Sequence, residues 1–184
     1  SKEDTVFDLY CGIGTISLYA AKWAKQVVGI EIVESAIANA KENARRNQID
    51  NVCFYCGDAG EITGRLQNKG ITADIVIVDP PRKGCSEELL QLLQDMNPKR
   101  VVYVSCNPAT LARDVKILMG YGFEVKKVQP VDMFCHSAHV ECVILLSQLP
   151  DEHIDIEINL DELDLTPAEC KATYPQIKAY VKEH

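Results

Sequence analysis

The chain has 184 residues, of which 47% are hydrophobic and 25% charged, and this composition is typical of one soluble globular domain with a short appendage. No run of about 18 apolar residues is present, so a membrane span is not expected. The net charge of -8 argues against broad, nonspecific attraction to nucleic acid, but much of the acidity lies in residues 150–164 and the remainder is nearer neutral. A nucleic-acid substrate is therefore compatible with the total charge.

The cysteines and the N-terminus predict a reducing compartment. Eight cysteines are scattered through expected strands and loops, unlike the dense framework of a small secreted protein, so we expect reduced thiols. The segment Ser1–Asp4 lacks the apolar stretch of a signal peptide. These features predict a cytoplasmic protein with no membrane contact.

Strand and helix patterns alternate in chain order, as in a parallel α/β sheet. Helices are predicted at residues 15–24, 35–46 (capped by Ser35), 87–96 and 109–119. Strands are predicted at residues 5–9, 27–30, 52–56, 73–78, 100–104, 122–129 and 140–147. Because only a short polar loop separates the last two strands, we expect them to pair directly. The result is a mostly parallel seven-stranded sheet with an antiparallel edge strand.

A change of texture divides the chain into a domain at residues 1–148 and an acidic C-terminal extension at residues 149–184. Alternating Ile154, Ile156, Ile158 and Leu160 are followed by Thr166-Pro-Ala-Glu169, a possible capping sequence. We expect a solvated acidic segment with a partial helix.

Polar residues follow four of the predicted strands, where ligands bind in open α/β sheets. The first strand leads into Asp8-Leu-Tyr-Cys-Gly-Ile-Gly-Thr15. The second, fourth and fifth strands lead to Glu31, to Asp79-Pro-Pro-Arg82 and to Cys106. This arrangement predicts a nucleotide-type cofactor pocket with a nucleophile beside it.

The first two strand ends predict which cofactor binds. Glu31 lies about twenty residues after the glycine turn, where a carboxylate can accept both ribose hydroxyls while Gly12 and Gly14 allow close approach of the ligand. Asp58 is placed either to reach an adenine edge or to form a turn after Gly57. A third glycine of the dinucleotide fingerprint is missing because position 17 is Ser. S-adenosylmethionine, which has no phosphate, fits this pattern better than a dinucleotide.

Residues 79–82 and the pair Cys106 and Glu141 predict chemistry on a base. Two consecutive prolines give the strand end a rigid rim that could hold a flat base, and Arg82 stands where exocyclic-amine methyltransferases usually have an aromatic residue. A thiolate and a carboxylate are the pair needed to methylate carbon 5 of a pyrimidine. The thiolate adds at carbon 6, and the carboxylate later removes the carbon-5 proton.

The sequence resembles the radical-free RNA uracil-5-methyltransferases, and is nearest to bacterial members that act on 23S ribosomal RNA. The resemblance covers residues 5–147 and rests on four motifs in order: Asp8-Leu-Tyr-Cys-Gly-Ile-Gly, Asp79-Pro-Pro-Arg-Lys-Gly84, Ser105-Cys-Asn-Pro-Ala-Thr-Leu-Ala-Arg-Asp114, and Asp132-x-Phe134 with His139-x-Glu141. It implies a Rossmann-like class I methyltransferase fold and transfer of a methyl group from S-adenosylmethionine, leaving S-adenosylhomocysteine, to a uridine in RNA.

The resemblance also implies a role for each matching residue. Cys106 is the nucleophile and Glu141 the proton acceptor. Residues that fall where the family contacts the cofactor are Tyr10, Thr15, Glu31, Asp58 and Asp79, together with the turn glycines Gly12 and Gly14. Residues assigned to the RNA substrate are Asp79, Arg82, Phe134 and His139.

Two departures from the family pattern stand out. Cys135 replaces the usual proline after Asp-x-Phe, which makes the loop near the base less rigid. Family members also carry upstream an RNA-binding barrel, a central domain, a cofactor-binding glutamine and often a cysteine-ligated iron–sulfur cluster, none of which is present in these residues. We therefore expect the catalytic domain alone, with most of the RNA affinity in upstream domains, and we expect no DNA partner.

Other interpretations remain open. The base could be cytosine, although such enzymes commonly use a Pro-Cys nucleophile whereas Cys106 follows Ser105. The chain could instead be a noncatalytic cofactor-binding or RNA-accessory module. For metals, Cys53 with Cys56 lacks a second ligand pair and the cluster Cys135, His136, His139 and Cys142 is explained by the family motif, so no metal site is predicted.

Overall fold

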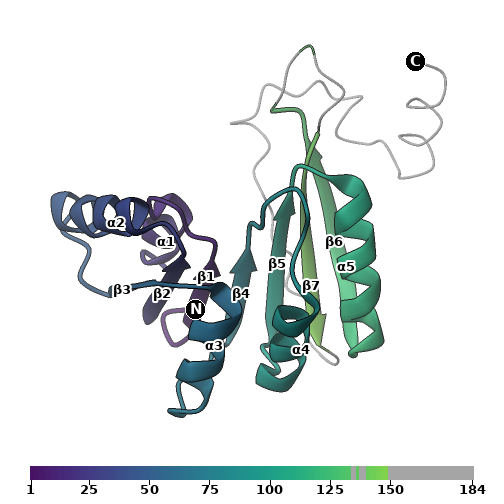
Figure 1. Ribbon diagram of the computed structural model, residues 1–184, viewed down its shortest axis with the longest axis horizontal. Coiled ribbons are helices and arrows are strands. Elements are labelled where there is room, and N and C mark those ends of the chain that lie inside the picture. The colour runs from purple at the N-terminus through teal and green to yellow at the C-terminus, as the bar shows by residue number, and fades with distance from the viewer. Residues whose placement is uncertain (134–135, 137–139, 149–184) are drawn as a thin grey trace. The chain divides into compact units, whose positions relative to one another are not determined.

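A computed structural model describes residues 1–133, 136 and 140–148 (Figure 1). The chain divides into the units Ser1–Pro150 and Asp151–His184, and the description covers the first. Phe134, Cys135, His139 and the predicted extension at residues 149–184 lie outside the described residues. Within the described ranges, no helix combines the length and apolar character needed to cross a membrane.

All seven predicted strands are present, together with one helix that the sequence analysis did not predict. The strands are β1 (Thr5–Leu9), β2 (Gln26–Glu31), β3 (Val52–Cys56), β4 (Ile75–Val78), β5 (Arg100–Ser105), β6 (Phe123–Val131) and β7 (Glu141–Gln148). The helices are α1 (Thr15–Ala20), α2 (Glu34–Arg46), α3 (Ala59–Gln67), α4 (Glu87–Met96) and α5 (Pro108–Gly120).

The strands form one sheet in the order β3-β2-β1-β4-β5-β7-β6, which confirms the predicted mostly parallel, Rossmann-like seven-stranded sheet. β1 pairs in parallel with both β2 and β4, so the strand order reverses at this point. One detail of the prediction is wrong. β7 is antiparallel to both of its neighbours but lies between β5 and β6, not at the edge. The crossover through α5 leaves space for one strand between β5 and β6, and β7 occupies that space.

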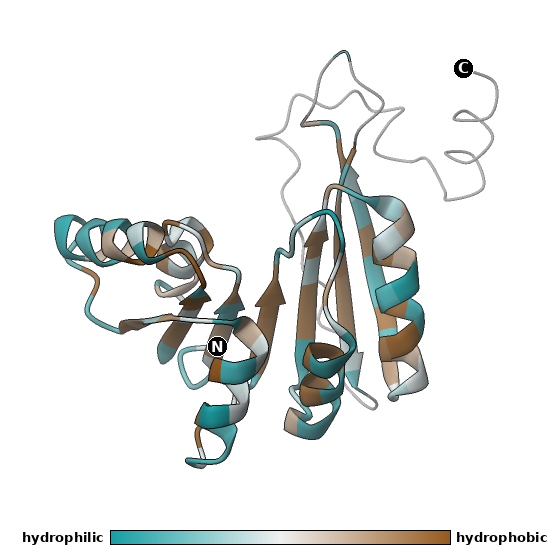
Figure 2. Ribbon diagram, in the orientation of Figure 1, coloured by the Kyte–Doolittle hydropathy of each residue, from teal (hydrophilic) through white to brown (hydrophobic). Residues whose placement is uncertain are grey.

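The apolar strands bury most of their side chains on the face that is covered by α3, α4 and α5. The main cluster joins strand residues such as Phe7, Val76 and Tyr103 to helix residues such as Leu93 and Leu118, all fully buried. Figure 2 shows the corresponding run of hydrophobic colour along the central strands. Smaller clusters join α1 and α2 to the same sheet. The strand ends that carry the candidate site are thus held by a rigid core.

The cap of one helix differs from the prediction, and one further helix was not predicted. Ser35 does not cap α2: the N-cap is Val33, no side chain caps the helix, and Ser35 is its second residue, so its hydroxyl is past the position where capping occurs. α3 was missed because its sequence contains two glycines, which have a low helix propensity. It forms because the Asp58 side chain caps it and because Ala59, Thr63 and Leu66 are buried.

Candidate functional site

The candidate site lies where the strand order reverses. A cleft of about 430 Å³ opens beyond the carboxyl ends of β1, β2 and β4. Ligands in open α/β sheets bind at such a point. The cleft is lined by Tyr10, Ile30, Glu31, Ile32, Gly57, Asp58, Ala59, Gly60, Asp79, Pro81, Lys83, Gly84 and Ser86.

The turn between β1 and α1 is tightly coiled and open on one side. Tyr10, Gly12 and Gly14 have φ values of 68°, 53° and 85°, a region that non-glycine residues rarely enter. A Cβ on Gly12 would meet nothing within 4 Å, whereas one on Gly14 would lie 2.9 Å from the ring of Phe54. The backbone is therefore accessible at Gly12, while Gly14 is needed for packing against β3. Thr15, also predicted to contact the cofactor, is exposed at the start of α1.

Glu31 joins the ends of β1 and β2. Its Oε2 accepts a hydrogen bond from the backbone N–H of Gly12 at 3.1 Å, and its Oε1 accepts one from the N–H of Val33 at 2.9 Å. A carboxylate has about four lone-pair positions, so both oxygens keep acceptor capacity. The half-buried carboxylate is thus oriented by the backbone and can still accept hydroxyl donors from a ligand.

Asp58 serves local structure as well as lining the cleft. Its Oδ1 accepts hydrogen bonds from the N–H groups of Gly60 at 2.9 Å and Glu61 at 3.2 Å, which makes Asp58 the N-cap of α3. Of the two roles considered from the sequence, the local one is therefore present. Oδ2 is the oxygen left to face a ligand.

Asp8 is a fully buried acid in the middle of the first strand, and the sequence analysis assigned it no role. Its Oδ2 accepts a hydrogen bond of 2.5 Å from the Ser17 hydroxyl, while its Oδ1 has no hydrogen-bond partner. Burial raises the pKa of Asp8 to about 6, and the negative charge of Asp79 adds to this shift. Burial also raises the pKa of Tyr10. A lone acid within an apolar strand was the signal that could have identified Asp8.

The register of the sheet places Cys106 beside Glu141. Ser105, the last residue of β5, pairs with Cys142 in β7. Because the two strands are antiparallel, the residue after Ser105, which is Cys106, comes opposite the residue before Cys142, which is Glu141. Cys106 is half-buried and has a free thiol. Burial raises the pKa of Glu141, and the charge of Asp79 raises it further. Asp79, whose own pKa is raised by loss of surrounding water, therefore lies near enough to act on Glu141.

The structure thus brings together most of the predicted site residues. Tyr10, Glu31, Asp58 and Asp79 line one cleft; Cys106 directly follows β5, the strand beside β4, and Glu141 begins β7, the next strand along. Arg82 is exposed on the loop after β4, and Lys83 of the same loop lines the cleft, although the sequence analysis gave it no role. Phe134 and His139 are outside the described residues, so their predicted roles are untested.

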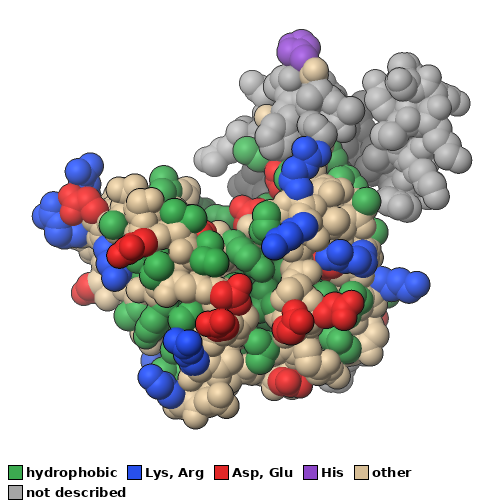
Figure 3. Space-filling view, viewed as in Figure 1, with side chains coloured by type: hydrophobic (Ala, Val, Ile, Leu, Met, Phe, Trp, Pro, Cys, Tyr) green, Lys and Arg blue, Asp and Glu red, His purple; other side chains and the backbone are tan. Residues whose placement is uncertain are grey.

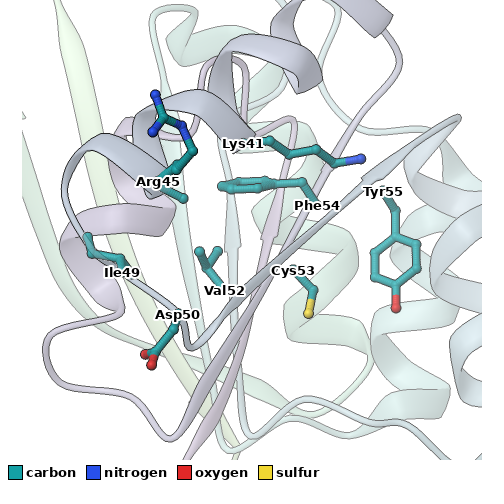
Figure 4. A pocket seen from close by; sticks show the side chains of 9 residues that line it. Lys41, Arg45, Ile49, Asp50, Val52, Cys53, Phe54 and Tyr55 are labelled. Atoms are coloured by element: carbon teal, nitrogen blue, oxygen red, sulfur yellow. The ribbon is translucent and has the colours of Figure 1, made fainter.

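A larger hollow of about 530 Å³ lies away from these residues, between α2 and the edge strand β3. In Figure 4, Lys41 and Arg45 flank it from α2, and Cys53 and Tyr55 project from β3. It is bordered by neither the glycine turn nor Cys106, so the smaller cleft is the candidate site. Among the described residues, no group of three His, Cys, Asp or Glu side chains is arranged to hold a metal ion.

Comparisons with known proteins show the family of the chain. The family model described as tRNA (Uracil-5-)-methyltransferase matches residues 1–149. A relative from Bacillus cereus named "Uncharacterized RNA methyltransferase" is 56% identical over 147 residues, which are 80% of this chain and 32% of the relative. A Clostridium tetani relative with the same name is 53% identical over 150 residues, 82% of this chain and 33% of the relative.

Solved structures extend the comparison. The tRNA (uracil-54, C5)-methyltransferase of Pyrococcus abyssi, in complex with S-adenosyl-L-homocysteine, has a TM-score of 0.69 and 37% identity, covering 78% of this chain and 34% of that one. An rRNA methylase from Streptococcus thermophilus, at 14% identity and a TM-score of 0.63, covers 82% of this chain and 89% of that one, and supports the fold alone.

The fold and the strand-end site define a class I methyltransferase domain. The chain belongs to the tRNA (uracil-5-)-methyltransferase family. It spans about one third of the length of the curated relatives that it matches.

Proposed function

We propose that the chain is the catalytic domain of an RNA uracil-5-methyltransferase, which moves a methyl group from S-adenosylmethionine to carbon 5 of a uridine. The observation that carries the proposal is the pairing of β5 with β7, whose register brings Cys106 beside Glu141, while Glu141 in turn senses the charge of Asp79 in the cleft.

The charged residues that line the cleft suit S-adenosylmethionine. This cofactor supplies a methyl group on a cationic sulfonium and also carries an adenosine, an ammonium and a carboxylate. Glu31 would accept the ribose hydroxyls, and the open side of Gly12 would let the ligand approach the backbone. Lys83 could pair with the ligand carboxylate, and the acids Asp58 and Asp79 suit its positive groups. Tyr10 and Thr15 complete the proposed cofactor contacts.

Cys106 and Glu141 would divide the reaction between them. Carbon 5 of uracil is a weak nucleophile, so the Cys106 thiolate first adds to carbon 6 and forms an enolate. Carbon 5 of the enolate then takes the methyl group. Glu141 removes the carbon-5 proton, the electrons of that bond restore the 5,6 double bond, and the thiolate leaves. The raised pKa of Glu141 makes it a stronger base than an exposed glutamate.

The loop after β4 would hold the target base. Pro80 and Pro81 restrict the backbone as it leaves the strand, and Asp79 and Arg82 stand on either side of them. We assign these two charged residues to the base or its strand, and propose that Phe134 and His139 also contact the substrate. RNA segments outside the reaction site would bind mainly to protein regions that correspond to the two thirds of the relatives' length beyond the part matched by this chain.

Assays of methyl transfer test this function. With S-adenosylmethionine and unmodified RNA, the full-length protein that carries this chain should methylate uridine, and Cys106→Ala should abolish the activity. Cys53→Ala is the matched control, because Cys53 is an exposed thiol on the edge strand. Product mapping distinguishes uridine from cytidine. We also propose ribosomal RNA as the substrate, since the motifs resemble those of the ribosomal RNA members most. Parallel reactions with ribosomal and transfer RNA should then show faster methylation of ribosomal RNA. Full activity of Cys106→Ala would refute the proposed chemistry.

A further inference from the structure

Side chains from the start of α5 donate hydrogen bonds to the backbone of the loop at Pro81–Cys85. The Arg82 carbonyl accepts hydrogen bonds from Asn107 Nδ2 at 2.9 Å and from the Thr110 hydroxyl at 3.1 Å. The carbonyls of Lys83 and Cys85 both accept from Nη2 of Arg113, at 3.1 and 3.2 Å. Three backbone carbonyls of the loop are therefore held by the helix that begins just after Cys106.

The buried carboxylate of Asp114 fixes both the loop and the Arg113 side chain. Its Oδ2 accepts hydrogen bonds from the N–H of Cys85 at 2.8 Å and from the Tyr103 hydroxyl at 2.6 Å. Its Oδ1 accepts from Arg113 Nε at 2.7 Å, so the same guanidinium that binds the loop is fixed by Asp114. Asp114 is fully buried, and a buried carboxylate is stable only when it is paired and hydrogen-bonded in this way.

Close packing at Gly84 shows how little freedom the loop has. Gly84 has φ +79°, and a Cβ there would lie 2.5 Å from Oδ2 of Asp114 and 2.7 Å from Nη2 of Arg113. The loop backbone therefore rests directly on the Arg113–Asp114 pair. A shift of these two side chains must move the loop.

We propose that Arg113 and Asp114 are positioning residues for the methyl transfer, which set the loop bearing Asp79 and Arg82 in register with the turn bearing Cys106. This inference rests on the proposed function. The base would lie between the loop and the thiol, and the Arg113–Asp114 pair, together with Asn107 and Thr110, joins the loop to the helix that follows Cys106. Misplacement of reacting groups by about 1 Å can cost on the order of 100-fold in rate.

The pair acts through geometry, so a residue of the same charge cannot replace Arg113. Arginine presents donors in a planar fork and can bind a carboxylate and two carbonyls together, whereas lysine is a flexible point charge. Arg113→Lys keeps the charge beside Asp114 but loses the fork. Because the Arg113 side chain is 51% exposed, this replacement leaves no cavity in the core.

The test compares Arg113→Lys with two controls in the full-length protein. Arg45→Lys and Arg65→Lys each alter an exposed arginine in an ion pair away from the loop. Single-turnover formation of the covalent RNA adduct should fall about 10- to 100-fold in Arg113→Lys and less than about threefold in the controls. Calorimetric affinity for S-adenosylhomocysteine should stay within about twofold of the wild type in all three.

Each outcome has a defined meaning. An unchanged rate of adduct formation in Arg113→Lys would overturn the proposal, and so would an equal loss of rate and cofactor affinity, since that pattern is expected of general structural damage. If the wild-type protein forms no adduct, or if Cys106→Ala forms one, the proposed function fails instead. Asp114→Asn gives a second comparison, in which the rate should fall at least as far as in Arg113→Lys.

Discussion

Ionisation of Asp8 should make the protein less stable as the pH rises. The buried carboxylate has a pKa near 6 in the folded chain, against an ordinary value of 3.8. Between these values the folded state binds more protons than the unfolded state, so the free energy of unfolding falls as the pH increases. The loss begins near the lower value and is complete above the higher one.

The size of the effect follows from the difference between the two values. One pH unit corresponds to about 1.4 kcal/mol, so the contribution of Asp8 amounts to about 3 kcal/mol. Asp8→Asn removes the titration and leaves a neutral group that can still accept from Ser17. The amide that replaces the unpartnered Oδ1 adds a cost of its own, but that cost does not depend on pH.

Urea unfolding at pH 4.5, 5.5, 6.5 and 7.5 measures this effect. The free energy of unfolding of Asp8→Asn minus that of the wild type should increase by about 2 kcal/mol across this range, because about a third of the full change occurs below pH 4.5. Asp74→Asn is a control, because the Thr5 N–H and Lys99 lower the pKa of Asp74, so this carboxylate is ionised in both states across most of the range and its difference from the wild type should stay nearly constant. A difference between Asp8→Asn and wild type that stays constant with pH would refute the account of Asp8.

Two further substitutions test the glycine turn and the cofactor cleft. Gly14→Ala should lower the free energy of unfolding by about 2 to 5 kcal/mol, because it adds left-handed backbone strain to a clash with Phe54. In Gly12→Ala the new Cβ meets no neighbour, so the loss should be only about 1 to 2 kcal/mol. Equal losses in denaturant unfolding would contradict the packing role of Gly14. Glu31→Ala should weaken S-adenosylhomocysteine binding by about 10- to 100-fold in calorimetry, and the exposed Glu61→Ala should not; unchanged affinity in Glu31→Ala would remove Glu31 from the cofactor site.

Much of the fold could be predicted because local patterns determine it. The apolar run at residues 100–104 and the glycine turn after β1 each carry their own signal of strand or turn. Glu31 could be assigned because a strand end fixes its place relative to the turn. These predictions depend on short stretches of sequence and on one general rule of α/β sheets.

The remaining features depend on contacts that are distant in sequence. α3 is stabilised by its Asp58 cap and by burial, not by its own helix propensity. The place of β7 depends on how far α5 carries β6, which no local pattern encodes. The hydrogen bonds from Arg113 to the loop join residues about thirty positions apart. Both acceptors on the loop are backbone carbonyls, which every residue has, so no side chain in the sequence indicates them.

The most direct test of the proposed chemistry is the fate of the RNA adduct in Glu141→Gln. Addition of Cys106 and methyl transfer should still occur in this variant, but removal of the carbon-5 proton should not. A methylated protein–RNA adduct should therefore accumulate and survive denaturing electrophoresis, and release of tritium from carbon-5-labelled uridine should be lost. Cys106→Ala should form no adduct at all. Normal turnover and tritium release by Glu141→Gln would contradict the assignment of Glu141 as the proton acceptor.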